Sequence, residues 1–509
     1  MLLFQSLLIL LVCAVLLAAL ARRLNLPYPS FLALGGTALA FIPNAPQLSL
    51  EPELTLALFV APALLDAAFD TSLRDLKRYW IPVMSLVFIA VGLTTAAVAW
   101  LVHYLVPDMP WPAAIAVGAI VAPPDAVAAS AVMRRLRIPH RVLVILEGES
   151  LLNDATALLT YRLAVSVTMG ATFTGTGTVI LSLAMLASVV VGFVLAQIFS
   201  RVMRHVTDVP SAIVLQFVTT FLVWIFAEEV GLSPIVTLVV YAISASRIAP
   251  QRTPAALRIP SYAVWETVVF VLNVLAFVLI GLQLRPIIQS LHANERVYYL
   301  EVAAAVLGMV ILVRLAWVMF YNRLAWWKHR LFGPGRWPGK FVPSVQGSFI
   351  VGWAGMRGIV TLATAYALPE TFPHRDLALL CAFFVVVGTL VLQGLTLRPL
   401  ILTLGLKDDG TIEHEVRVAQ DVLALVALEI LETDNSPTAN ALRDEFVTTE
   451  VAESDAPHAT AREARNLLRI RILDAQREAL VKMRDTAEIG DDAFHRIEDY
   501  LDRVEFNVR

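Results

Sequence analysis

The sequence predicts an all-α polytopic membrane protein with about 13 transmembrane helices and a helical region after the last span. Hydrophobic residues make up 58% of the 509 residues and charged residues only 16%, and the mean hydropathy is +0.72. A soluble domain is roughly 45–50% apolar and about 25% charged. Residues 407–509 hold 13 basic and 24 acidic residues, whereas the first 406 hold 26 and 18. The composition argues against a soluble enzyme and predicts a basic membrane part followed by an acidic region in water.

Thirteen apolar runs bounded by Pro, Gly or charged residues are the candidate spans, since a spanning helix needs about 20 apolar residues and fewer when other helices surround it. The first run has no basic segment before it and no small-residue cleavage signature, so we expect a retained helix rather than a signal peptide. The predicted spans are Leu2–Leu20, Phe31–Ile42, Leu54–Phe69, Pro82–Leu105, Trp111–Met133, Val142–Met169, Val179–Val202, Ser211–Ala227, Leu232–Ala245, Tyr262–Leu284, Val297–Tyr321, Val345–Leu368 and Leu377–Leu404.

Basic residues occur in alternate loops, which tests the number of spans independently. The second, fourth, sixth and eighth loops contain no Lys or Arg. Only Arg285, Arg296 and Arg375 are expected on the same side of the membrane as these loops. By the positive-inside rule the N-terminus lies outside the cell membrane and the acidic region lies in the cytoplasm. We therefore predict a transmembrane domain at 1–404 and a cytoplasmic helical region at 405–509. The basic loops hold Arg22 and Arg23; Arg74, Lys77 and Arg78; Arg134, Arg135, Arg137 and Arg141; Arg201 and Arg204; Arg247, Arg252 and Arg258; and the run from Arg323 to Lys340.

Two spans are short and two are interrupted, and the members of each pair are seven helices apart. The pairs are Phe31–Ile42 with Leu232–Ala245, and Ala122–Asp125 with Gly352–Gly358. An odd offset turns the partners upside down relative to each other. This pattern predicts inverted repeats at about 1–170 and 210–404, joined by a linker helix at 179–202. The alternative is that the four spans are unrelated, because short and interrupted helices are common in membranes.

The sixth span carries the densest set of polar residues inside an apolar run, Glu-Gly-Glu-Ser-Leu-Leu-Asn-Asp. At about 100° per residue, Glu149, Ser150, Asn153 and Asp154 share one face of a helix. That face offers carboxylate, hydroxyl and amide oxygens, which suit hard cations rather than zinc or copper. An acidic helix start would explain Glu147 and even Glu149. It does not explain Asp154, at least one turn further into the apolar run, where an ionisable group is a functional candidate.

The two interrupted spans supply further polar groups. The Pro-Pro pair that ends at Pro124 removes backbone donors, so the nearby carbonyl groups need a cation, a water or a side chain. Asp125 follows where a half-helix begins, and we expect it to be both a cap and part of a binding site. Arg357 stands in the glycine-rich break of the twelfth span. Because arginine keeps its proton, we expect an acid partner, Glu149 first and Glu147 second.

The tenth span holds Glu266 and Asn273, seven residues apart on one helix face. Asn273 either reaches the cation layer or bonds between helices, and both alternatives stay open. Three more ionisable residues lie within apolar runs, Asp66, Arg162 and Arg314. We interpret these three as structural groups, near interfaces or in pairs.

Five motifs at these positions together resemble one transporter family. They are Gly-Glu-Ser-Leu-Leu-Asn-Asp at Gly148–Asp154, Pro-Pro-Asp at Pro123–Asp125, Gly-Met-Arg-Gly at Gly355–Gly358, Gly-Leu-Ser at Gly231–Ser233 and Asn-x-x-x-Phe at Asn273–Phe277. With them the chain is similar to the first monovalent cation–proton antiporter family, the NhaP-type bacterial antiporters and their relatives, the eukaryotic sodium/proton exchangers. The likeness covers the membrane part and fades in the acidic region.

The resemblance implies an NhaA-like inverted-repeat fold of 13 helices with two crossed discontinuous helices, a homodimer, and electroneutral exchange of one Na⁺ for one H⁺. Such an exchange serves pH and sodium homeostasis. We accordingly expect a transporter in the lipid bilayer rather than an enzyme. We expect no cofactor beyond the transported Na⁺ and H⁺, and no nucleic-acid partner.

The resemblance also assigns roles by position. Asp154 is implied as the carboxylate shared by cation and proton, with Glu149 and Ser150 as further Na⁺ ligands. Asn153 is implied as the residue that separates this family from an electrogenic branch, and Arg357 as the partner of the Glu. Much of the family has Thr-Asp-Pro where this chain reads Pro-Asp-Ala at 124–126. Pro124 has no hydroxyl, so only its backbone carbonyl can bind a cation at the first of these positions. Which cation the protein selects therefore stays open.

Three functional interpretations follow from these residues. In a Na⁺ or Li⁺ antiporter, ionised Asp154 binds the cation and releases it when a proton arrives. A K⁺/H⁺ antiporter of the same fold would use the same oxygen ligands. A membrane ion or pH sensor would instead signal through 405–509, where apolar patterns at Val422–Ile430 and Leu467–Leu473 predict helices without a kinase or nucleotide-binding motif. In an antiporter, the same region would regulate transport or help dimerisation. An organic-anion symporter would not need a carboxylate cluster facing its cargo.

Overall fold

The computed structural model describes residues 2–508 except 25, 43–50, 134–135, 137, 171–174, 207, 249–254, 292–294, 333–343, 407, 433–438 and 441–458. Every regular element among the described residues is a helix. The predicted all-α class is therefore confirmed.

A helix or a run of helices occupies each of the 13 predicted spans. In chain order they are α1 (Leu2–Arg23), α2 (Tyr28–Ala40), the run α3 (Pro52–Thr55), η1 (Leu56–Val60) and α4 (Ala61–Phe69), the run α6 (Trp80–Met84), η2 (Ser85–Ala90) and α7 (Val91–Leu105), the pair α8 (Trp111–Val121) and α9 (Ala126–Met133), α10 (His140–Thr168), α11 (Gly175–Met203), α12 (Val209–Glu229), α13 (Pro234–Ile248), α14 (Ala255–Leu282), α16 (Arg296–Phe332), the pair α17 (Val345–Trp353) and α18 (Ile359–Tyr366), and α19 (Arg375–Leu404). Between spans lie α5 (Leu73–Arg78) and α15 (Leu284–Ser290). Seven of the described helical stretches are long and apolar enough to cross a bilayer by length and composition alone.

Local side-chain chemistry sets several helix ends. The Asp208 carboxylate accepts a hydrogen bond from the backbone N–H of Ser211 (3.0 Å) and starts α12, while the Ser344 hydroxyl accepts one from Gly347 (3.1 Å) and starts α17. Such caps satisfy amides that have no partner within the helix. Helix α19 ends at Gly405, whose φ of 63° lies in the left-handed region that glycine adopts readily. The membrane part therefore ends with a defined helix stop.

Close helix contacts depend on small residues. Helices α2 and α14 pack against each other. A Cβ atom at Gly36 would collide with the backbone of Val278, and one at Gly281 would collide with the backbone of Ala33. Glycine at both positions lets the two backbones approach, as is common between membrane helices.

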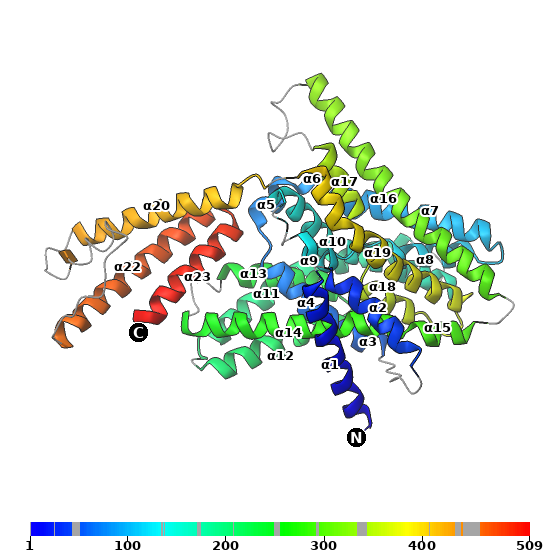
Figure 1. Ribbon diagram of the computed structural model, residues 1–509, viewed down its shortest axis with the longest axis horizontal. Coiled ribbons are helices and arrows are strands. Elements are labelled where there is room, and N and C mark those ends of the chain that lie inside the picture. Colours follow the sequence, from blue (N-terminus) through cyan, green and yellow to red (C-terminus); the bar gives the residue numbers. More distant parts are fainter. Residues whose placement is uncertain are drawn as a thin grey trace.

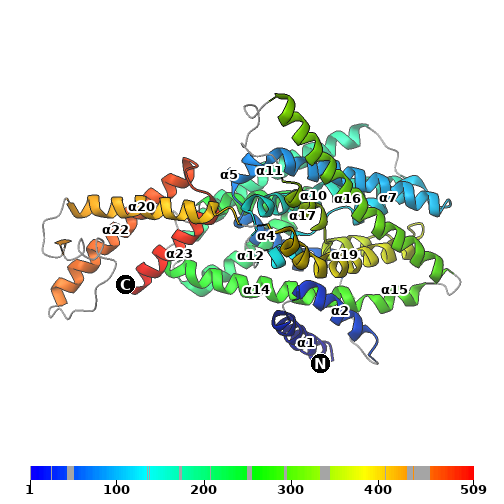
Figure 2. The ribbon, with the colours of Figure 1, turned by 45° about the horizontal axis from the view of Figure 1, so that its top comes forward.

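The spans form two mutually packed groups. Helices α7, α8, α10, α16, α17 and α19 pack on one another, and α14 packs against α1, α2, α4 and α12. An apolar cluster joins α4 and α12 of this second group to α11 and α13, and it includes Leu151 and Ala155 of α10. Helix α10 therefore belongs to the first group and touches the second. In Figure 1 and Figure 2, α14 runs along the bundle with α15 at one of its ends.

The acidic region folds into three described long helices, α20 (Thr411–Glu432), α22 (Ala459–Asp485) and α23 (Asp491–Val508). We call these helices the tail. They pack around buried apolar residues that include Leu423, Leu473, Leu480, Phe494 and Leu501. The helices predicted from Val422–Ile430 and Leu467–Leu473 lie within α20 and α22. Figures 1 and 2 show the tail at the end of α14 opposite to α15.

Some predicted features lie outside the described residues. They are the loop cations Arg134, Arg135, Arg137 and Arg252, and the part of the Arg323–Lys340 run at 333–340. The division into two domains at 404 and the inverted repeat stay predictions.

Candidate functional site

The interruption between α8 and α9 comprises residues 122–125, as the two prolines predict. Ala122, Pro123 and Pro124 are buried in the bundle, and Asp125 is half-buried. The Asp125 carboxylate accepts a hydrogen bond from the backbone N–H of Val127 (2.8 Å) and so caps the start of α9. The predicted cap is therefore present, and it lies where the dipole of a half-helix favours a negative charge.

The interruption between α17 and α18 comprises residues 354–358 and contacts the first one. The backbone N–H of Asp125 donates to the carbonyl of Met356 at 2.7 Å. A Cβ atom on Gly358, the residue before α18, would overlap the Asp125 carboxylate. The two broken spans therefore cross where both second halves begin, with Asp125 beside each of these helix starts.

Arg357 occupies the crossing, but its predicted acid partner was wrong. The guanidinium is 1% exposed and donates to the carbonyl groups of Val121 (3.1 Å), Ala122 (3.0 Å) and Gly355. The interrupted backbone frees these oxygens, and the five N–H groups of arginine match several of them at once. The salt bridge of Glu149 is formed with another arginine, and Glu149 acts on Arg357 only through the longer-range attraction of their charges.

Glu149 pairs instead with Arg314 of α16. The two guanidinium nitrogens lie 2.5 and 2.8 Å from the two carboxylate oxygens, in a bidentate arrangement. Glu149 is 1% and Arg314 2% exposed, and Arg314 also donates to the carbonyl of Val351 at 3.0 Å. Paired, hydrogen-bonded charges are the form in which ions persist in an interior. Arg314 was expected to be a structural group, near an interface or in a pair. It is paired, but its partner lies in the candidate site and was not foreseen.

Asn153 joins α10 to the first interruption. Its amide nitrogen donates to the carbonyl of Pro124 at 2.8 Å, and the side chain is fully buried. The backbone oxygen that we assigned to cation binding therefore accepts a hydrogen bond from Asn153, although a carbonyl has a second lone pair. The amide oxygen of Asn153 has no partner among the described residues.

Asp154 lies next to Asn153 and close enough to Asp125 for the two charges to repel each other. Its side chain is partly exposed. Among the described residues its carboxylate has neither a hydrogen-bond donor nor a cationic partner. Two carboxylates of one helix thus meet different surroundings, because Glu149 is neutralised by Arg314 and Asp154 is not.

A cavity of about 300 Å³ lies beside α10, between η2, α7 and α8. Its wall includes the hydroxyl-bearing residues Thr95, Thr156 and Thr160, and the Thr95 hydroxyl has no partner within the described part of the chain. The cavity begins two residues beyond Asp154 on the same helix. Space and polar groups therefore lie next to the candidate site.

The remaining predicted site residues differ in their surroundings. Ser150 is half-buried on α10. Asn273 is half-buried on α14 and Glu266 is exposed there, and neither bonds to the described residues of the α10 cluster. Within the described residues, no group of three or more His, Cys, Asp or Glu is arranged to hold a metal ion. The oxygen-bearing groups at the crossing are thus the candidate ligands.

Solved structures support the same fold. A sodium proton antiporter from Methanocaldococcus jannaschii, solved at pH 8, superposes with a TM-score of 0.59 at 19% identity, covering 79% of this chain and 99% of that one. At this identity the comparison shows the fold alone.

Sequence comparisons extend over most of the membrane part. A sodium, potassium, lithium and rubidium/H⁺ antiporter of Bacillus pumilus is 31% identical over 72% of this chain and 56% of its own length. A Na⁺/H⁺ antiporter of Halobacillus dabanensis is 27% identical over 79% of this chain and 98% of its own length. The chain spans less than two thirds of the Bacillus relatives, with 63% for that of Bacillus subtilis.

The family described as sodium/hydrogen exchanger, transmembrane, matches residues 7–403, which include α10 and both interrupted spans. The match confirms the resemblance read from the motifs. The chain belongs to the sodium/hydrogen exchanger family of membrane transporters.

Proposed function

We propose that the protein exchanges a monovalent cation for a proton, with the Asp154 carboxylate as the group that holds either one. The observation that carries this proposal is the contrast along α10. Arg314 binds both oxygens of Glu149, whereas Asp154 has no donor or cation among the described residues. A carboxylate without a fixed partner is free to bind a transported ion.

The chemistry is a competition at one side chain. Ionised Asp154 binds Na⁺, with Asp125, Ser150 and the second lone pair of the Pro124 carbonyl as further ligands. These hard oxygen donors suit alkali cations. A proton that reaches Asp154 removes its charge, so the cation leaves. Because proton and cation exclude each other, the downhill flow of one drives the other.

Formal charges at the crossing support a one-to-one exchange. Arg314 and Arg357 contribute two positive charges, while Glu149, Asp125 and Asp154 contribute three negative ones. The sum of minus one becomes zero when either one Na⁺ or one H⁺ is bound. The loaded site is then neutral in both forms, so the membrane potential would not drive the cycle.

The orientation and the assembly belong to the same proposal. The basic loops lie in the cytoplasm by the positive-inside rule, with the N-terminus outside, the tail inside and the protein in the inner membrane. The group that contains α10 moves against the group that contains α14, opening the crossing to each side in turn. We assign the second group to a homodimer interface, as the family resemblance implies.

K⁺ is the second candidate cargo. The Bacillus relatives are named as sodium, potassium, lithium and rubidium/H⁺ antiporters, and nothing in an oxygen ligand set excludes the larger ion. A sensor of ions or pH remains the alternative from another class, and it predicts no net cation-dependent proton flux.

A transport assay tests the proposal. Purified protein in proteoliposomes that carry a pH-sensitive dye receives Na⁺, Li⁺ or K⁺, and proton release is recorded. We expect wild type to exchange and Asp154→Asn to lose exchange while keeping its thermal unfolding temperature. Asp108→Asn, in an exposed loop, is the matched control and should behave like wild type. Retained exchange in Asp154→Asn would refute the assignment, and absence of flux in wild type would favour the sensor.

A further inference from the structure

The tail is fixed to the transport bundle by charged side chains. Arg258, near the start of α14, is 4% exposed and binds Asp502 of α23 through two nitrogens, one of them at 2.9 Å, with Glu498 at 3.5 Å. Removing one partner of such a pair is costly, because the other charge is then left buried without compensation. Helix α23 is thereby fixed to the helix group of α14.

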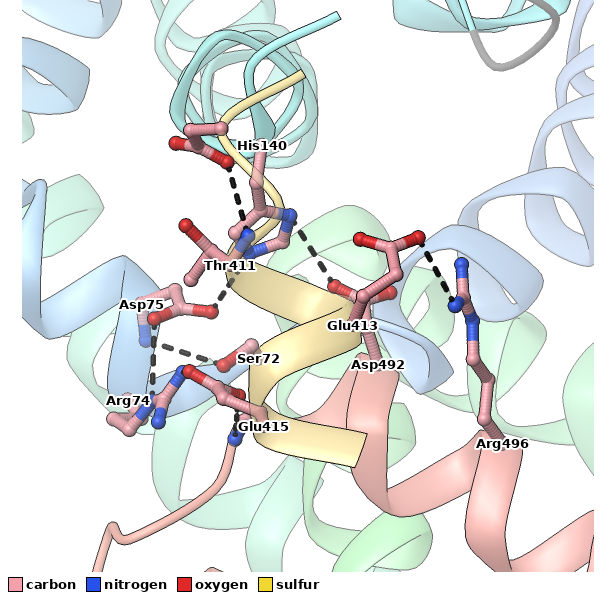
Figure 3. A network of polar contacts seen from close by, with 11 residues as sticks. Ser72, Arg74, Asp75, His140, Thr411, Glu413, Glu415, Asp492 and Arg496 are labelled. Atoms are coloured by element: carbon pink, nitrogen blue, oxygen red, sulfur yellow. Dashed lines mark hydrogen bonds and ion pairs between the residues drawn. The ribbon is translucent and has the colours of Figure 1, made fainter. Parts of the chain in front are cut away.

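A second contact joins the tail to α5, the short helix before the fourth span (Figure 3). The Arg74 guanidinium lies 2.6 Å from the Glu415 carboxylate of α20. The other oxygen of Glu415 accepts a hydrogen bond from the backbone N–H of Gly490 at 2.6 Å, immediately before α23. Glu415 therefore connects α5, α20 and the start of α23.

His140, the first residue of α10, lies between two carboxylates in this network (Figure 3). Its Nε2 is 3.0 Å from Asp75 of α5, and its Nδ1 is 3.6 Å from Asp492 of α23. At 3.6 Å the Nδ1 contact is longer than a hydrogen bond, so the attraction to Asp492 is ionic and requires the protonated, positively charged ring. Protonation of His140 therefore adds an ionic contact between α10 and α23, beside the arginine contacts that dock the tail.

The charges around His140 come from every element packed there and are mainly acidic. Helix α5 contributes Asp75 together with Arg74 and Arg78, and α10 contributes Arg141. The tail contributes Asp409, Glu413, Glu415 and Asp492 together with Arg496. Burial by itself lowers the pKa of His140. The hydrogen bond to Asp75 and the charges of Asp492, Asp75 and Asp409 outweigh burial, so the pKa is raised above its usual value.

The position of His140 links this contact to transport. Asp154 follows His140 on the same uninterrupted helix, α10. The tail helix α23 holds His140 at one point and Arg258 of α14 at another. It therefore bridges the two helix groups that must move past each other if the proposed alternating access is right. Any contact that bridges them opposes that motion.

We infer that the His140–Asp492 contact is a proton-sensitive latch, by which the tail slows exchange when the tail side of the membrane is acidic and releases it when that side becomes alkaline. This inference rests on the proposed function. A group whose pKa is raised in the closed state stabilises that state below its ordinary pKa, about 6.5 for histidine, and the contribution is lost as the pH rises through the raised value. The latch therefore loosens as the pH on the tail side rises through the raised pKa of His140.

Two variants and two matched controls test the latch in vesicles whose tail side faces the bath. His140→Gln removes the titration, and Asp492→Asn removes the partner on the tail. His414→Gln changes an exposed histidine of α20, and Asp499→Asn changes an α23 carboxylate that pairs with the exposed Arg503 of the same helix. Exchange rates are recorded at bath pH 6 and 8.5. In parallel, hydrogen exchange of α23 amides is measured and corrected for its intrinsic pH dependence.

We expect wild type to protect α23 better and to exchange more slowly at pH 6 than at pH 8.5. Both test variants should lose this difference, exchanging about three- to tenfold faster than wild type at pH 6, the range for a coupling of up to one pKa unit. Both controls should follow wild type. The latch is overturned if both test variants keep the wild-type pH dependence of the exchange rate. It is also overturned if they change the protection of the α23 amides without changing the exchange rate. If wild type shows no exchange at all, the proposed function fails, while the α23 protection profile still decides whether His140 controls docking.

Discussion

At the scale of single residues, the buried pair between Glu149 and Arg314 occupies the Glu149 carboxylate. Asp154 is then the carboxylate that remains to bind the transported ion. Arg314→Gln leaves Glu149 buried without a cation, and breaking such a pair costs about 3–5 kcal/mol. We expect a lower thermal unfolding temperature and weaker exchange, because Glu149 then competes with Asp154 for the proton and the cation.

The double variant Glu149→Gln, Arg314→Gln is the control for this prediction. It removes both charges and should recover most of the lost stability, as a double-mutant cycle of unfolding temperatures would show. Equal or greater destabilisation in the double variant would contradict the idea that an isolated charge causes the loss.

The residue types of this site could be predicted from the sequence, but not all of their partners. Spacing along α10 places Glu149, Asn153 and Asp154 on one face. It does not say which neighbouring helix lies opposite each of them. Arg357 and Arg314 are both arginines within apolar spans, and only the packing of α16 and α17 decides that Arg314 reaches Glu149.

At the scale of elements, the crossing of the two interrupted spans needs the absence of a side chain at Gly358. A Cβ there would overlap the Asp125 carboxylate. Gly358→Ala should therefore displace Asp125 from its place beside both helix starts. Overpacking of this kind costs about 1–3 kcal/mol, and we expect exchange to fall sharply. The measurement is the Na⁺-induced rise in unfolding temperature together with transport.

Gly92→Ala in α7 is the matched control, because outside its own helix backbone no atom of the described residues lies within 4 Å of the Cβ it would add. It should keep transport and the Na⁺ effect. Equal losses in both variants would show that the crossing is not specifically sensitive to Gly358.

The existence of these interruptions could be predicted from proline and glycine alone, whereas their contact could not. Two adjacent prolines remove two backbone donors and disfavour helical geometry in the residues before them, wherever the rest of the chain packs. The hydrogen bond from Asp125 to Met356 joins segments more than 200 residues apart in the sequence. It depends on the packing of the whole bundle, about which local patterns carry no information.

At the scale of the whole molecule, the composition predicted an acidic helical region beside the membrane part. It did not predict that this region docks. The basic residues that set the predicted orientation have a second use, because Arg74 and Arg258 from two such loops bind Glu415 and Asp502 of the tail. A charge imbalance indicates that two parts can attract each other, but the specific pairs follow only from the fold.

The docking contact at Arg258 should differ from the one at His140 in its pH dependence. Arginine stays charged throughout the physiological range, so the contact with Asp502 holds α23 at pH 6 and at pH 8.5 alike. Arg258→Gln should therefore lower the protection of α23 amides and raise the exchange rate at both pH values, whereas His140→Gln acts at pH 6 only. Arg503→Gln changes an exposed α23 residue that pairs with Asp499 of the same helix. It is the control and should change neither quantity. Should Arg258→Gln alter protection at pH 6 alone, the two contacts would not be independent, and the tail would be held by one titrating network rather than by a permanent contact and a switchable one.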